Sequence, residues 1–144
     1  MKVAIGSDHG GYELRQTIMN HLSERGIEYV DFGCPDLSSC DYPDFGKAVA
    51  KAVVSGECGK GIVICTTGIG ISITANKFKG IRCALCSDVI SAKLTRLHND
   101  ANVLAMGAGF VGPMTAKEIV DTFLSTEFSG EERHIRRINK IEND

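Results

Sequence analysis

Short runs of apolar residues alternate with amphipathic segments along the chain. The apolar runs are typical of β-strands. They lie at residues 2–7, 27–32, 61–65, 81–86 and 103–106. The amphipathic segments predict helices over residues 10–25, 44–55, 69–78, 88–98, 115–124 and 131–141. In the first helix Leu14, Ile18 and Leu22 share one face because they recur at helical spacing.

This alternation of five strands with helices predicts a parallel α/β sandwich, with one five-stranded parallel sheet in an α/β/α arrangement. Residues 61–65 form a continuous apolar run of the kind that is buried on both faces of such a sheet. No internal repeat or linker interrupts the pattern, and 144 residues suit a single domain over 1–144.

Composition excludes several classes of protein. The chain has 16 Lys and Arg against 18 Asp and Glu, so its net charge of -2 gives no general attraction to nucleic acid or to anionic membranes. Its longest apolar run is far shorter than the roughly 20 residues that a membrane-spanning helix needs. The N-terminus meets a charged residue too early for a secretory signal. We therefore expect a cytoplasmic protein that binds neither nucleic acid nor membranes.

The six cysteines do not indicate a disulfide framework or a metal site. Nothing in the sequence suggests secretion, and a domain of this length needs no cross-links. Cys83 and Cys86 have the spacing of a metal-binding pair, but they fall in a predicted strand, where residues three apart point to opposite faces. We expect both to be small core residues.

Three glycine-rich, polar segments follow predicted strands, at residues 6–11, 65–72 and 107–109. In a parallel sheet, ligands bind at the carboxyl ends of the strands. The sequence therefore predicts a functional site where these three segments meet.

Cys65 is the candidate for chemistry in the second of these segments. It closes an apolar strand and precedes Thr67, Gly68 and Gly70, which lead into a predicted helix. Backbone N–H groups at such a loop can converge on an anion, and the helix N-terminus would lower the thiol pKa from about 8.5 toward neutrality. The segment thus offers a base or nucleophile beside an oxyanion hole. The alternative is a core cysteine before a tight turn.

Three familiar loops do not fit this segment. A phosphatase-type Cys-x5-Arg loop needs arginine where Ile71 stands, and a Walker A loop needs a lysine before Ser72, where Ile71 again stands. A dinucleotide-binding fingerprint needs its third glycine at Ile73.

Histidines and arginines elsewhere supply further candidates. Asp8 with His9, and His98 near a helix end, suggest acid or base groups and, less readily, metal ligands, because only these three residues are obvious ligands. His98 could also simply complement the helix dipole, and His21 is expected to be a solvated surface residue.

The last predicted helix carries two arginines on one face. Arg133 and Arg137 are four residues apart, which suits a fork for a phosphate group. Glutamates lie nearby, so a solvated, salt-bridged helix is the alternative.

Taken together, seven segments resemble the ribose-5-phosphate isomerase type B family, which also includes galactose-6-phosphate and allose-6-phosphate isomerases. The matching segments run in order over essentially the whole chain. They are GSDHGG at 6–11, DYPD at 41–44, ICTTGIGIS at 64–72, ANK at 75–77, GIR at 80–82, HNDANV at 98–103 and RHIRR at 133–137.

The resemblance implies an aldose–ketose isomerase that works without metal or cofactor. It implies a Rossmann-like domain that forms a homodimer or a dimer of dimers, with the helix at about 131–142 packing on the partner subunit. Cys65 stands at the position of the family's proton-shuttling base. Some members instead use a glutamate at the position of Ile71, which cannot act as a base.

The resemblance also implies roles for the other candidates. His98 would open the furanose ring, and Thr67 and Asp8 would handle the ring oxygen and hydroxyls. The remaining implied residues bind the substrate. They are His9, Arg133 and Arg137 for the phosphate, Gly68, Ile69, Gly70, Ile71 and Asn99 for the enediolate, and Tyr42, which lies in a matching segment.

Two positions depart from the family's pattern. Thr66 stands where the family usually has glycine, and Gly109 stands where many members carry an arginine. Alternatives to a ribose 5-phosphate isomerase are an isomerase of a six-carbon sugar phosphate and a non-catalytic module that binds sugar phosphates.

Overall fold

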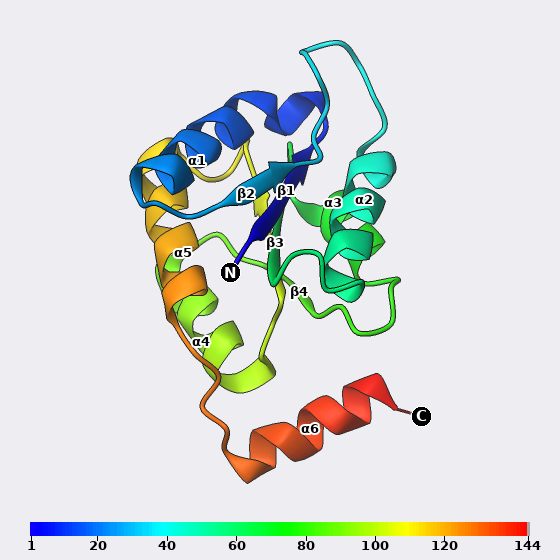
Figure 1. The fold of residues 1–144 in the computed structure, drawn as a ribbon, viewed down its shortest axis with the longest axis vertical. Helices are drawn as coiled ribbons and strands as arrows, with labels where there is room; N and C mark the ends of the chain where they lie inside the picture. The colour runs from blue at the N-terminus through cyan, green and yellow to red at the C-terminus, as the bar shows by residue number, and fades with distance from the viewer. Residues whose placement is uncertain (144) are drawn as a thin grey trace.

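A five-stranded parallel sheet forms the centre of the molecule in the computed structural model, which describes residues 1–143 (Figure 1). The strands are β1 (Val3–Ser7), β2 (Tyr29–Asp31), β3 (Lys60–Cys65), β4 (Cys83–Leu85) and β5 (Val103–Gly107). They lie in the order β2-β1-β3-β5-β4, and each neighbouring pair is parallel. The predicted Rossmann-like fold is therefore confirmed.

Helices cover both faces of the sheet. They are the short η1 (His9–Gly11), α1 (Tyr12–Glu24), α2 (Tyr42–Val54), α3 (Ile69–Ala75), α4 (Val89–Asn99), α5 (Pro113–Ser125) and α6 (Glu132–Glu142). Helices α1, α4 and α5 lie on one face, α2 and α3 lie on the other, and α6 stands apart at one end (Figure 1). None of the helices within residues 1–143 is long and apolar enough to cross a membrane.

The three central strands are buried on both faces, as the continuous apolar run of β3 predicts. Ile62 and Ile64 face the cluster under α1, α4 and α5, whereas Val63 and Cys65 face the cluster under α2 and α3. Successive side chains of a strand point to opposite faces, so one run of apolar residues serves both cores. This burial makes β3 a rigid support for the segment that follows it.

The edge strands β2 and β4 are shorter than the predicted ranges 27–32 and 81–86, because each pairs with a single neighbouring strand. The N–H of Ile27 bonds to the carbonyl of Leu22 and closes α1, so this residue is part of a turn. Helix α3 ends before residue 76 because the Asn76 side chain holds the backbone of β4. Its amide exchanges two hydrogen bonds of 2.8 and 2.9 Å with Cys83.

His21 is the clear error among the sequence predictions. It is buried, and its Nε2 lies 2.7 Å from Asp121 Oδ1, because α1 packs against α5 and the carboxylate faces the ring across that contact. Cys83 in β4 and Cys86 just after it point to opposite faces of the sheet, as strand geometry predicts. Cys86 is buried in one core cluster, and the half-buried Cys83 packs against the other.

Candidate functional site

The three glycine-rich segments meet at the carboxyl edge of the sheet. Ser7 ends β1 beside β3, and Cys65 at the end of β3 lies opposite Gly107 at the end of β5. The Gly109 N–H donates to the Thr66 carbonyl at 2.8 Å, which ties the segment after β5 to the one after β3. The predicted meeting point is therefore present.

Cys65 is held under a tight turn. Its sulfur accepts a hydrogen bond of 3.1 Å from the N–H of Gly68, and its side chain is nearly enclosed. Gly68 has a φ of 77°, and a Cβ there would lie 2.7 Å from the Met106 carbonyl carbon and 2.8 Å from the Gly107 nitrogen. Only glycine fits both the conformation and the space, so this residue directs an amide at the sulfur.

The first turn of α3 continues this site. The Thr67 hydroxyl accepts a hydrogen bond of 3.1 Å from the Ile69 N–H. The Tyr42 ring lies over Gly70, where a Cβ would come within 2.5 Å of the ring. The Ile71 side chain points away into the core under α2 and α3. The first-turn N–H groups of a helix have no intrahelical acceptor, so beyond Ile69, whose N–H is bound to Thr67, the backbone here can still donate.

Asp8 and His9 lie after β1 on the same edge. Asp8 is buried, and its carboxylate caps η1 by accepting a 3.1 Å hydrogen bond from the Gly11 N–H. His9 Nδ1 accepts from the Cys40 N–H at 3.2 Å. A neutral imidazole with an acceptor Nδ1 carries its proton on Nε2, so His9 offers an N–H donor on its other side.

Sequence reasoning missed Arg15, which is almost fully buried behind this edge. Its guanidinium donates to the Ser7 hydroxyl and to the Cys34 carbonyl, each at 2.6 Å. It thereby ties the end of β1 to the loop that presents Cys40 to His9. A signal was present, because Arg15 lies three residues before Ile18 and so falls on the apolar face of α1.

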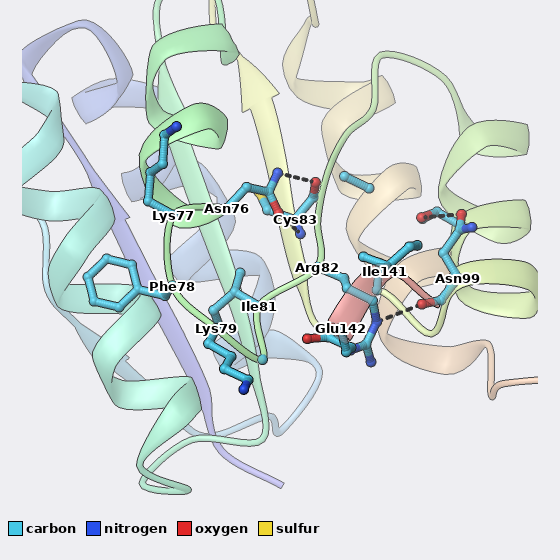
Figure 2. A pocket seen from close by; sticks show the side chains of 14 residues that line it. Asn76, Lys77, Phe78, Lys79, Ile81, Arg82, Cys83, Asn99, Ile141 and Glu142 are labelled. Carbon is cyan, nitrogen blue, oxygen red and sulfur yellow. Dashed lines mark hydrogen bonds and ion pairs between the residues drawn. The ribbon is translucent and has the colours of Figure 1, made fainter. Parts of the chain in front are cut away.

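A second group of candidates lies at the end of α4. The rings of His98 and His134 stack with centroids 4.5 Å apart and an angle of 18° between their planes. Arg82 donates to the carbonyl of Asn99 at 2.8 Å and forms an ion pair of 2.6 Å with Glu142 of α6. Figure 2 shows Arg82 between these two residues, at one side of a cavity of about 650 Å³.

The two groups lie at opposite edges of the sheet. Helix α4 runs back across the sheet before β5 begins, so His98 and Asn99 lie near the amino ends of the strands. Cys65 lies at their carboxyl ends, and β5 alone spans roughly 13 Å between the edges at about 3.3 Å per residue. Helix α6, which carries Arg133 and Arg137, lies at the same end as His98 (Figure 1). One chain does not bring all of its predicted site residues together.

The candidate metal ligands do not cluster among the residues that the structure describes. Within residues 1–143 there is no group of three His, Cys, Asp or Glu side chains that could hold a metal ion. The buried Cys65 has an amide as its neighbour, and His9 is held by the backbone of Cys40.

Comparison with known proteins gives the family. The sequence profile described as "Ribose/Galactose Isomerase" matches residues 3–141. The chain belongs to this family. Ribose-5-phosphate isomerase B of Escherichia coli is 49% identical over 140 residues, which cover 97% of this chain and 93% of that protein.

Solved structures of the ribose/galactose isomerase family agree over nearly the whole chain. Clostridium thermocellum ribose-5-phosphate isomerase B has a TM-score of 0.97 at 56% identity, covering 99% of this chain and 95% of that one. The Thermotoga maritima ribose 5-phosphate isomerase has a TM-score of 0.96 at 48% identity, covering 98% and 97%. The matched region of this sugar phosphate isomerase includes both groups of candidate residues, from Asp8 at one edge to Arg137 at the other.

Proposed function

We propose that this protein interconverts ribose 5-phosphate and ribulose 5-phosphate through an enediolate, with Cys65 as the acid/base residue. The observation that carries the proposal is the Cys65 sulfur at the end of β3, 3.1 Å from the Gly68 amide. The names of the similar proteins from E. coli and C. thermocellum support the same substrate.

The reaction needs one base that returns the proton it takes. As a thiolate, Cys65 removes the proton from C2 of the open-chain aldose, and the resulting thiol gives it to C1 of the enediolate. The hydroxyl at C2 loses its proton and becomes the ketone, while the oxygen at C1 gains one. Thr67 and Asp8 handle the ring oxygen and the hydroxyls of the sugar. The first-turn amides of α3 stabilise the enediolate, and one such donor contributes on the order of 10²–10³ in rate.

The remaining residues come from a second copy of the chain. His98 opens the furanose ring, Asn99 contacts the enediolate, and Arg133 and Arg137 meet the phosphate together with His9 of the first copy. A homodimer is supported by the separation of the two groups within one chain. It is also supported by apolar side chains exposed beside Thr67, of which Leu85, Ile69 and Phe110 are 44%, 50% and 71% accessible.

Substitution of the sulfur tests the chemistry. Cys65→Ala is expected to lower kcat by about 10²–10⁴ while binding of the sugar phosphate persists. Cys58→Ala is the matched control, since Cys58 is also a buried cysteine but lies at the other edge, before β3. The assignment is wrong if the Cys65 variant keeps a tenth of wild-type kcat.

Mixing two inactive variants tests the shared site. In a Cys65→Ala and His98→Asn heterodimer, one site contains both substitutions and the other contains none. Random exchange of equal amounts should therefore restore about a quarter of wild-type activity. If both residues served the same chain's site, every site would carry one substitution and no activity would return.

The same assay, run over pentose and hexose phosphates, tests the substrate. Gly109 has no side chain beside Thr66, which favours a roomier site and makes a six-carbon sugar phosphate the second candidate. Turnover of galactose 6-phosphate or allose 6-phosphate alone would favour that candidate. Binding of ribose 5-phosphate without any turnover would instead indicate a non-catalytic binding module.

A further inference from the structure

The stacked pair of His98 and His134 joins α6 to the body of the molecule. His134 is the buried residue of α6, with 6% of its surface accessible, and it lies in the first turn of that helix. His98 is exposed in the last turn of α4. The His134 ring therefore covers one face of the His98 ring, while the edge of the His98 ring, which carries its nitrogens, remains accessible to a neighbouring chain.

The surroundings of His134 favour its neutral form. Burial lowers the pKa of His134, and the neighbouring His98, Arg133 and Arg137 lower it further, while Glu131 acts in the opposite direction. The Glu131 carboxylate lies 3.4 Å from His134 Nε2. A neutral His134 can stack on His98 without repelling the positive charge that His98 acquires when it accepts a proton.

We infer that His134 is a positioning residue for ring opening, holding the His98 imidazole in one orientation through the stack. The inference rests on the proposed function, in which His98 opens the sugar ring. An imidazole on an exposed helix end otherwise turns about two side-chain torsions. Aromatic stacking of this kind favours one arrangement by about 3- to 10-fold, and a proton transfer needs such a fixed geometry.

The opposite end of α6 provides an independent attachment. Arg82 pairs with Glu142 there, so α6 remains tied to the α4 end of the molecule when the His134 ring is replaced. This separates two effects. Loss of the stack changes the orientation of His98, whereas release of α6 would displace Arg133 and Arg137 and weaken phosphate binding.

Two substitutions distinguish the flat ring from simple burial. His134→Leu fills the space without an aromatic face, and His134→Phe restores a ring that can stack. The Leu variant should lower kcat for ribose 5-phosphate about ten-fold, and the Phe variant should stay within about three-fold of wild type. Binding of 5-phosphoribonate, an open-chain analogue that needs no ring opening, should be unchanged in both.

Three results would overturn the inference. The first is wild-type kcat in His134→Leu, and the second is an equal loss in the Leu and Phe variants. The third is a weakening of 5-phosphoribonate binding that matches the loss of kcat, which would indicate displacement of α6. If the Leu variant does not fold, His134→Gln is compared with His134→Phe in the same way. Failure of the proposed function is recognised separately, by activity that survives Cys65→Ala.

Discussion

Gly68→Ala is a sharp test of how the turn after β3 supports the chemistry. The residue has a φ of 77°, which costs an L-residue about 1–2 kcal/mol. The added Cβ would also lie within 2.8 Å of backbone atoms of Met106 and Gly107, which cannot move as a flexible side chain would. Overpacking of this kind costs about 1–3 kcal/mol. The free energy of unfolding should fall by about 2–5 kcal/mol in total.

The same change at Gly26 is the matched control. Gly26 has a φ of 70°, and nothing lies within 4 Å of the position that its Cβ would take. Gly26→Ala should therefore lose only the conformational part, about 1–2 kcal/mol. Urea denaturation of both variants at one fixed protein concentration gives the difference, because the stability of the proposed dimer would depend on concentration.

Activity gives the second measurement. Accommodating the Cβ must shift the Gly68 amide that donates to Cys65, and a displacement of about 1 Å at a reacting group can cost 10²-fold in rate. Gly26→Ala should keep wild-type kcat. The reasoning is refuted if the two variants lose equal stability, or if Gly68→Ala folds and isomerises at the wild-type rate.

Three further outcomes are expected. Arg137→Ala should raise KM for ribose 5-phosphate by roughly one to two orders of magnitude, because a charge-assisted hydrogen bond to the phosphate is lost. Arg136 lies about 100° away around the helix, so Arg136→Ala should leave KM unchanged. The reverse pattern in steady-state kinetics would disprove the assigned helix register. Iodoacetamide should label Cys65 before Cys86, because burial raises the pKa of Cys86 to about 11 and leaves little of the reactive thiolate. Mass spectrometry of the labelled peptides would contradict this if Cys86 were modified first. EDTA should leave the rate unchanged, and a loss that added divalent metal restores would show that the reaction needs a metal.

The fold was predictable because the continuous apolar run of β3 requires helices on both faces of the sheet. A strand whose residues 61–65 form a continuous apolar run needs a core on both faces, and the structure has Ile64 in one core and Cys65 in the other. The edge strands were less predictable. Pairing on one side only allows them to end early, and local sequence does not reveal which strands lie at an edge.

The site was predictable in part. Residues at the end of a strand or just after it, such as Cys65 and His9, could be assigned to one edge from strand order alone. The partners of buried polar side chains could not: helical spacing places Arg15 on the apolar face of α1, but no local pattern pairs it with Cys34 or pairs His21 with Asp121. Residue types and helical spacing mark the candidates, but only the packing of α1 against its neighbours decides which partners those side chains contact.

In the proposed dimer with shared sites, the placement of Cys65 and His98 at opposite edges of each chain has a genetic consequence. A cell that carries the normal gene and a Cys65→Ala copy would still assemble heterodimers with one working site. A copy that carries both Cys65→Ala and His98→Asn would disable both sites of every heterodimer that it enters. With equal expression and random pairing, about three quarters of all dimers would then contain no working site. The double allele would therefore be dominant, although each single allele would be largely recessive.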